Sequence, residues 1–144
     1  MRILLVHQNF PGQFRQLAPF LLRAGHELVA ICSHKRPIGF QCRVLRYEPT
    51  NVPKGLSLNS ELSMEAFDRA IKVSRLCNQL KEEGWNPDRI CAHSGWGETL
   101  AINEVWEDVP QILWPELWVR PEHGGYGVDP LKPKPTLDHH LEQL

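Results

Sequence analysis

Several features that define common protein classes are missing from this 144-residue sequence. No apolar stretch approaches the ~18 residues of a membrane span, and the opening Met-Arg-Ile-Leu-Leu-Val lacks the cleavage site of a signal peptide. The four cysteines include no Cys-x-x-Cys pair, which argues against a disulfide framework or a zinc site. Lys and Arg total 16 against 17 Asp and Glu, so the positive excess of a nucleic-acid binder is absent. We expect a cytoplasmic protein that binds no nucleic acid.

Sequence motifs that would mark several enzyme classes are absent as well. After the first apolar run only Gly12 remains of a Gly-x-Gly-x-x-Gly fingerprint, and no acidic residue follows the second run, which argues against a nicotinamide dehydrogenase. There is no Walker A sequence, no Gly-x-Ser-x-Gly elbow and no His-x-x-x-His pair. We therefore expect neither a metal nor a bound cofactor.

The chain has the length and composition of one globular domain, with 42% hydrophobic and 23% charged residues. Residues 3–6 form a short apolar run of the kind buried on both faces of a parallel sheet. Apolar residues over 14–22 recur at helical spacing, and Gly25 follows as a cap. Pro19 predicts either a kink or a helix that begins late enough to hold it in the first turn. Residues 28–32 read as a second strand.

The rest of the chain continues this alternation. We predict strands at 44–47, 89–92 and 111–114, a helix over 60–83 and another over 98–106. We expect the longer helix to pack on the sheet through one apolar stripe, which comprises Leu62, Ala66, Ala70, Val73, Cys77 and Leu80. Residues 121–135 hold four prolines and three glycines and read as loop, with a turn of helix over 137–144. The fold class is α/β, a Rossmann-like doubly wound and mostly parallel sheet.

Two segments follow strands at the edge where open α/β sheets bind ligands. They are residues 7–14 and residues 93–99, and each leads into a predicted helix whose N-terminus favours anions such as phosphate. His7, Gly12 and His93 are the candidate residues in these segments.

The same segments resemble the N-terminal lobe of family 4 glycosyltransferases, which are retaining enzymes of the GT-B fold. The resemblance rests on Met1–Ala18, on Ala24–Val29, and on the strand Pro87–His93. His93-Ser-Gly-Trp-Gly-Glu98 and Pro115-Glu-Leu-Trp118 match one bacterial branch, so the resemblance covers roughly residues 1–118.

The resemblance implies a donor, an acceptor and a set of substrate-binding residues. The donor would be a nucleotide sugar such as a UDP- or GDP-sugar, and the acceptor a sugar or a lipid-linked sugar. This lobe would supply the acceptor pocket, a glycine loop near the donor diphosphate at Gly12 and Gln13, and His93 near the transferred sugar. Trp96 and Glu116 are further substrate-binding candidates, and no catalytic residue is assigned to this lobe.

Each candidate also has a purely structural explanation. Gly12 can provide the positive φ of a turn, and His7 and His93 can be hydrogen-bonded at strand ends. Trp96 can pack on its neighbours rather than stack on a sugar, and Glu116 can be a solvated carboxylate. Trp114 and Trp118 are expected in the core or in contact with a second lobe.

The expected organisation is a lobe over residues 1–118 and a Pro/Gly-rich extension over 119–144 that belongs to its unfinished remainder. The family's C-terminal, donor-binding lobe is absent from this sequence, so we expect the chain alone to be inactive. Location at the inner face of a membrane, through peripheral contact, stays open. The alternative function is a stand-alone nucleotide- or partner-binding module of the same fold without catalysis.

Overall fold

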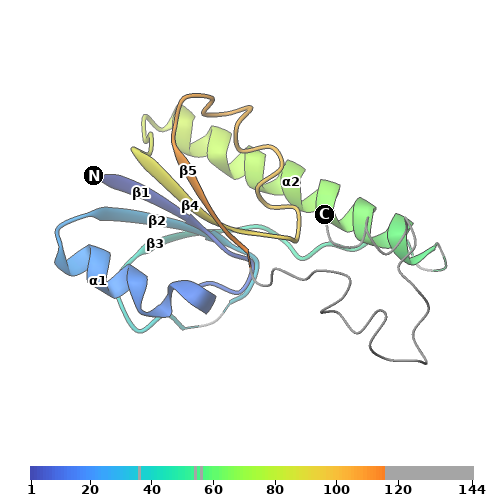
Figure 1. Ribbon diagram of the computed structural model, residues 1–144, viewed down its shortest axis with the longest axis horizontal. Helices are drawn as coiled ribbons and strands as arrows, with labels where there is room; N and C mark the ends of the chain where they lie inside the picture. Colours follow the sequence, from blue (N-terminus) through green and yellow to red (C-terminus); the bar gives the residue numbers. More distant parts are fainter. Residues whose placement is uncertain (36, 54, 56, 116–144) are drawn as a thin grey trace, which may run out of the picture.

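The computed structural model describes residues 1–35, 37–53, 55 and 57–115, which form one parallel sheet with a helix on each face (Figure 1). The sheet has the order β3-β2-β1-β4-β5, and all four neighbouring pairs are parallel. Its strands are β1 (Arg2–Val6), β2 (Glu27–Cys32), β3 (Arg43–Arg46), β4 (Arg89–Ser94) and β5 (Gln111–Pro115). The α/β, doubly wound architecture predicted from the sequence is confirmed.

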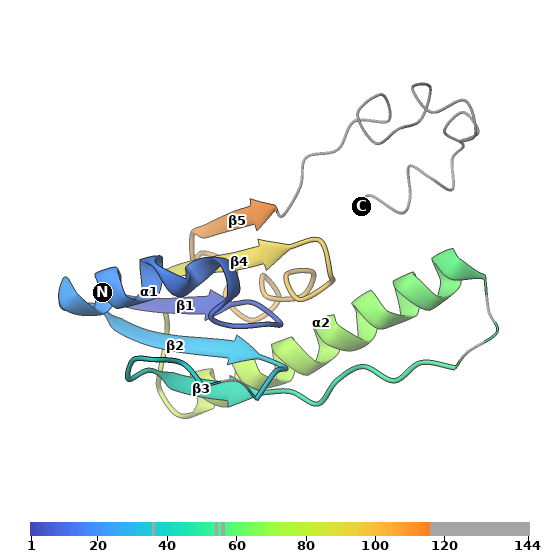
Figure 2. The same cartoon turned by 90° about the horizontal axis from the view of Figure 1, so that it is seen from below.

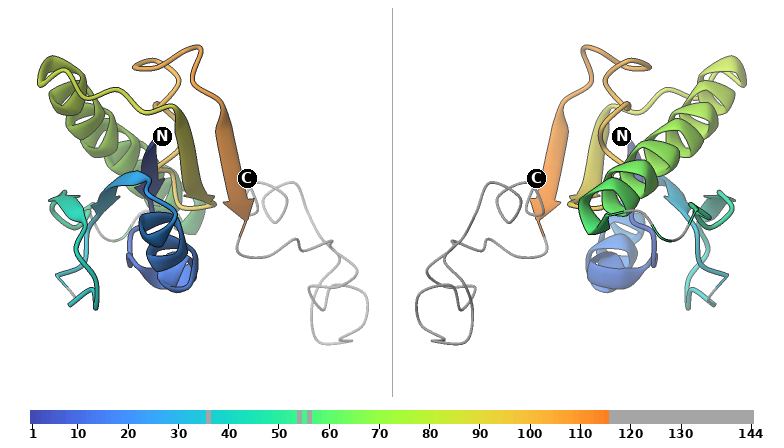
Figure 3. Two further views of the ribbon diagram at one scale, coloured as in Figure 1. Left: turned by 90° about the vertical axis from the view of Figure 1, so that its left-hand side faces the viewer. Right: turned by 90° about the vertical axis from the view of Figure 1, so that its right-hand side faces the viewer.

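The central strands are buried on both faces, as their continuous apolar sequences predict. Leu4 and Val6 lie in the core on the side of α2 (Leu58–Glu82), while Ile3 and Leu5 lie in the core on the side of α1 (Leu17–Arg23). Figures 2 and 3 show α1 and α2 on opposite faces of the sheet. Because side chains alternate along a strand, β1 and β2 each contribute to both cores.

The first crossover places Pro19 where a helix tolerates it. Residues Gly12–Arg15 form a short 3-10 helix, η1, and α1 begins only at Leu17, so Pro19 falls in its first turn. An interior proline removes a hydrogen bond, but the first-turn N–H groups have no helical partner anyway. Gly25 follows α1 with a φ of +80°, as expected for a helix-terminating glycine.

The long helix α2 begins two residues earlier than predicted and is buried along only part of its length. Ser57, not Ser60, is the N-cap: its Oγ accepts a hydrogen bond from the Ser60 N–H. Val73, Cys77 and Leu80 are buried against the sheet, but Leu62 of the predicted stripe is exposed. The reason is length, since 25 residues of helix reach ~37 Å whereas six residues of strand reach ~20 Å. The first half of α2 therefore extends past the strand ends (Figure 2).

The helix predicted over 98–106 is wrong, because this segment is a series of turns. Leu100 N–H bonds to the Gly97 carbonyl and Val105 N–H to the Ile102 carbonyl, each spanning three residues. Ile102, Val105 and Trp106 of this segment are nevertheless buried. A nine-residue helix has little stability of its own, so packing decides the backbone here.

The strand order fixes where a ligand site is expected. The chain runs from β1 outward to β2 and β3, then returns through α2 to β4 on the other side of β1. The carboxyl ends of β1 and β4 thus flank the point at which the strand order reverses. The predicted boundary at 118, the extension and the turn over 137–144 lie outside the described residues. Within the described part, no helix is both long and apolar enough to span a membrane.

Candidate functional site

Two buried histidines meet where the strand order reverses. His7 follows β1 directly and His93 is the penultimate residue of β4, and their ring centroids lie 4.7 Å apart with planes inclined by 37°. Only 7% of His7 and 1% of His93 is exposed. The structure therefore brings together the two segments that the sequence singled out separately.

The ring of His7 is held in one orientation by its own loop. The Asn9 backbone N–H donates to His7 Nδ1 at 3.0 Å, so Nδ1 carries no proton in this arrangement. A neutral His7 ring consequently has its proton on Nε2. Phe14 packs edge-on against the ring with centroids 6.0 Å apart. Backbone and aromatic contacts together point Nε2 in a fixed direction.

Gly12 lies against that Nε2 atom. Its φ is +41°, and a Cβ at this position would come within 2.5 Å of His7 Nε2. Glycine is thus required both by the backbone conformation and by the close approach of the imidazole. Next to it, the side-chain oxygens of Gln13 and Asn9 are buried and have no hydrogen-bond partner among the described residues. Buried polar atoms are normally hydrogen-bonded, so these two oxygens are candidates for contact with a ligand.

The loop after β4 is docked on α2 by its backbone. Arg69 Nη1 donates to the Trp96 carbonyl at 2.9 Å, while Arg69 also pairs with Glu65 at 2.8 Å. Gly97 has a φ of +101°, and a Cβ there would lie 2.3 Å from the Ala66 carbonyl oxygen. With its backbone held in this way, Trp96 leaves 40% of its surface exposed.

A buried Tyr47–Glu98 hydrogen bond closes the same loop, and the sequence reasoning missed it. Tyr47 Oη donates to Glu98 Oε1 at 2.9 Å, and Glu98 is 1% exposed. Burial, followed by the charge and the hydrogen bond of Glu98, raises the pKa of Tyr47 far above its usual value. The signal available in the sequence was position: Tyr47 ends a predicted strand, and Glu98 follows the glycine loop.

The remaining aromatic candidates divide between the edge strand and the part of the chain outside the described residues. Trp114 on β5 is 44% exposed and packs edge-on against Phe14 with centroids 6.1 Å apart. It therefore joins the 3-10 helix to the edge strand rather than filling the core. Glu116 and Trp118 lie outside the described residues.

The four cysteines are free thiols. Burial raises the pKa of Cys77 to about 12 and that of Cys42 to about 11, and it also raises the pKa of Cys32 and Cys91. Thiols held in the protonated form are weak nucleophiles and weak metal ligands. Among the described residues no group of three His, Cys, Asp or Glu is arranged to hold a metal ion.

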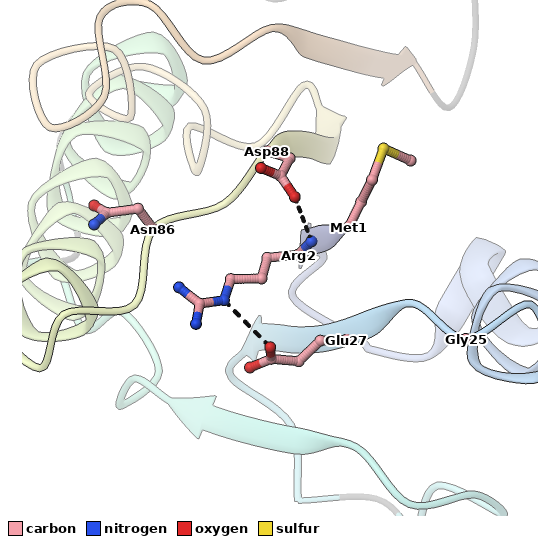
Figure 4. Close-up of a pocket in the computed structure, with 6 residues that line it drawn as sticks. All are labelled: Met1, Arg2, Gly25, Glu27, Asn86 and Asp88. Carbon is pink, nitrogen blue, oxygen red and sulfur yellow. Dashed lines mark hydrogen bonds and ion pairs between the residues drawn. The ribbon is translucent and has the colours of Figure 1, made fainter.

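A pocket of about 590 Å³ lies at the opposite, amino-terminal edge of the sheet (Figure 4). Its polar groups bind one another: the Arg2 N–H donates to Asp88 at 2.7 Å, and the Arg2 guanidinium pairs with Glu27 at 3.3 Å. Glu27 also accepts from Trp85 Nε1 at 2.6 Å. These bonds join the starts of the central strands, so this hollow is explained by structure, and the histidine pair stays the candidate site.

The fold and the histidine pair define a class: an open parallel α/β domain with a candidate site where the strand order reverses. Comparison with known proteins makes this specific. The family model of the glycosyl transferase family 4 group matches residues 24–143. The chain therefore belongs to the glycosyl transferase family 4 group, and the resemblance to an N-terminal GT-B lobe is confirmed.

A solved structure supports the fold. The crystal structure of the glycotransferase of kitacinnamycin matches with a TM-score of 0.59 at 17% identity, covering 84% of this chain and 32% of that one. This chain thus spans about a third of the length of that protein. The C-terminal domain of a hydrogenase from Pyrococcus furiosus matches at 14% identity with a TM-score of 0.49, covering 78% and 89% of the two chains, a likeness too distant to bear on function. A search of curated proteins found no match.

Proposed function

We propose that this chain is the acceptor-side lobe of an enzyme that transfers a sugar from a nucleotide-sugar donor, with retention of anomeric configuration. Membership of the glycosyl transferase family 4 group supports the reaction class. The observation that carries the proposal is the pair of buried rings of His7 and His93 at the reversal point of the strand order. In such sheets this is where ligands bind.

In the proposed reaction His93 contacts the transferred sugar, and the loop around Gly12 and Gln13 lies near the donor diphosphate. The Gln13 and Asn9 side-chain oxygens, buried and unsatisfied among the described residues, are suited to accept hydrogen bonds from substrate hydroxyls. Trp96, with its backbone held by Arg69 and its side chain partly exposed, provides a surface for a sugar ring. Most of the leaving-group stabilisation would come from a second lobe, which binds the donor nucleotide.

The first test is to assay this chain alone, and then supplied with a donor-binding lobe of the family, for transfer from UDP- and GDP-sugars. We expect turnover only with the second lobe, and a product whose anomeric configuration matches that of the donor. Turnover by this chain alone at an ordinary enzyme rate would contradict the division into two lobes. An inverted product would contradict retention.

The second test is His93→Ala in the reconstituted enzyme. Since the His93 and His7 rings lie 4.7 Å apart where the strand order reverses, we expect turnover to fall ~10-fold or more. His93 is 1% exposed, so its truncation also leaves a cavity and lowers the unfolding free energy. Turnover and urea unfolding are measured on the same preparation. Unchanged turnover would assign His93 a structural role.

A further inference from the structure

A second hollow, of about 450 Å³, lies at the carboxyl ends of β2 and β3. These strand ends lie on the same edge of the sheet as the carboxyl ends of β1 and β4 (Figure 2). It is lined by Ser33–Lys35, which follow β2, and by Arg46–Pro49 at the end of β3. Pockets for small ligands have volumes of about 300–1,000 Å³, so this one has room for a small polar molecule.

The pocket holds two cationic side chains, Lys35 and Arg46. Among the described residues, neither Lys35 nor Arg46 forms an ion pair, whereas four other cationic side chains do: Arg2, Arg43, Arg69 and Lys72. Arg46 Nε donates to the His34 carbonyl at 3.4 Å, which orients the guanidinium. Its two terminal nitrogens have no hydrogen-bond acceptor within the described part of the chain, so they are open to an anion.

The wall of the pocket is fixed to the candidate site. The Gln8 carbonyl accepts hydrogen bonds from the Ser33 and His34 backbone N–H groups at 3.0 and 3.1 Å, and His34 Nδ1 lies 3.3 Å from the same oxygen. Gln8 follows His7 directly in the chain. A ligand in the pocket is therefore adjacent to the loop that carries His7.

The pocket combines groups that suit a phosphate with groups that suit a sugar. The guanidinium of Arg46 can donate two parallel N–H hydrogen bonds to a phosphate, and the ammonium of Lys35 adds a positive charge. Glu48, which also lines the pocket and forms no ion pair among the described residues, can accept hydroxyl hydrogens but repels a bare phosphate dianion. Tyr47 and Pro49 provide apolar wall for a ring.

We propose that this pocket binds the phosphate group of a phosphorylated sugar acceptor, an assignment that rests on the proposed acceptor-side role of this lobe. Lys35 and the terminal nitrogens of Arg46 contact the phosphate, and Glu48 contacts the sugar hydroxyls. The phosphate thereby anchors the acceptor beside His7 and selects charged acceptors over neutral ones.

The test is titration of the ¹⁵N-labelled chain with inorganic phosphate, glucose 6-phosphate and glucose, followed by backbone amide shifts. We expect saturable shifts at Ser33–Lys35 and Arg46–Glu48 with both phosphates, with tighter binding of glucose 6-phosphate, and none there with glucose. Removing one charge–phosphate contact by Lys35→Ala should weaken glucose 6-phosphate binding about fivefold or more.

Arg75→Ala is the matched control, because Arg75 is an exposed arginine on α2 and its loss changes the net charge equally. Equal weakening by Lys35→Ala and Arg75→Ala would show general charge attraction and overturn the proposal. Absence of saturable shifts at the pocket would overturn it too. Shifts with uridine diphosphate as strong as those with glucose 6-phosphate would assign the pocket to the donor and overturn the acceptor assignment.

A second variant tests the sugar contact. Glu48→Gln removes a repulsion that acts on both phosphates and weakens the contact with the sugar hydroxyls, so inorganic phosphate should bind more tightly and the preference for glucose 6-phosphate should shrink. An unchanged preference would contradict the role of Glu48. These measurements involve no sugar transfer. A negative result would therefore overturn the phosphate pocket only, and the two activity tests described above decide on the transfer reaction.

Discussion

Because Gly12 has no side chain, the His7 ring can lie directly against the backbone of the candidate site. We expect Gly12→Ala to lower the unfolding free energy by ~2 kcal/mol or more, because the new methyl group would meet the His7 ring and the φ of +41° is unfavourable for alanine. Urea unfolding measures this loss. Gly39→Ala is the control, since Gly39 has no positive φ and nothing within 4 Å of a Cβ. Equal losses in the two variants would contradict the close approach.

The Tyr47–Glu98 bond gives a second prediction for a single residue. Tyr47→Phe leaves the buried Glu98 carboxyl group without its hydrogen-bond donor, so we expect a loss of ~1–3 kcal/mol. In a Glu98→Gln background the same change should cost less, because a neutral amide is cheaper to leave unsatisfied. A double-mutant cycle of urea unfolding measures the difference, and purely additive losses would show that the two side chains are not coupled.

The sequence predicted His7 and His93 as candidate site residues because each stands directly after or at the end of a buried strand, and Gly12 because it lies in the loop that follows the first strand. It could not predict the Tyr47–Glu98 bond, since the two residues are 51 positions apart and neither lies in a periodic pattern. Such a bond depends on the path of the loop after β4 toward the end of β3, and local spacing carries no information about that path.

At the scale of elements, the docking of the β4 loop on α2 depends on two glycines with different surroundings. Both Gly95 and Gly97 have positive φ values, of +120° and +101°, but only at Gly97 would a Cβ meet the backbone of Ala66. Gly95→Ala should therefore cost backbone strain alone, and Gly97→Ala strain plus displacement of the loop, with a loss larger by ~1 kcal/mol or more. Urea unfolding of the pair compares them, and equal losses would refute the contact with α2.

The strands were predictable because a strand buried on both faces needs a continuous apolar run, and residues 3–6 and 28–32 are such runs. The backbone of residues 98–106 was not predictable, although the apolar residues of this segment recur at helical spacing. There the backbone is fixed by Gly97 against α2 and by Glu98 bonded to Tyr47, and three-residue turns bury the same side chains. Likewise, α2 extends past the strand ends because it is longer than the strands, and the sequence of the helix carries no information about the length of the strands.

For the whole molecule, the buried thiols and Tyr47 predict alkaline instability. Ordinary thiols ionise near pH 9.0, but the pKa of Cys77 is about 12 in the folded chain. Above pH 9 the unfolded chain therefore holds fewer protons than the folded one, and the unfolding free energy falls with rising pH. Cys77 contributes a slope approaching ~1.4 kcal/mol per pH unit, and Tyr47 adds to the fall above about pH 10.

Urea unfolding under reducing conditions, between about pH 8 and about pH 10.5, measures this slope. Cys77→Ala provides the control: it lowers the overall stability by leaving a small cavity, but it removes one titrating group and should flatten the decline. A stability that is constant over this range would contradict the burial of the thiols.

The position of β1 in the middle of the sheet also bears on how the chain is made. Synthesis proceeds from the N-terminus, so β1 acquires its neighbour β2 once residue 32 has emerged, while its other neighbour, β4, begins only at residue 89. In the interval between, β1 can pair with β2 alone, so a sheet of β1, β2 and β3 would have an open edge at β1. The α2 side of these strands also lacks its cover until residue 82 has been made, so we expect the central strand of the finished sheet to lack partners on one edge and one face during synthesis.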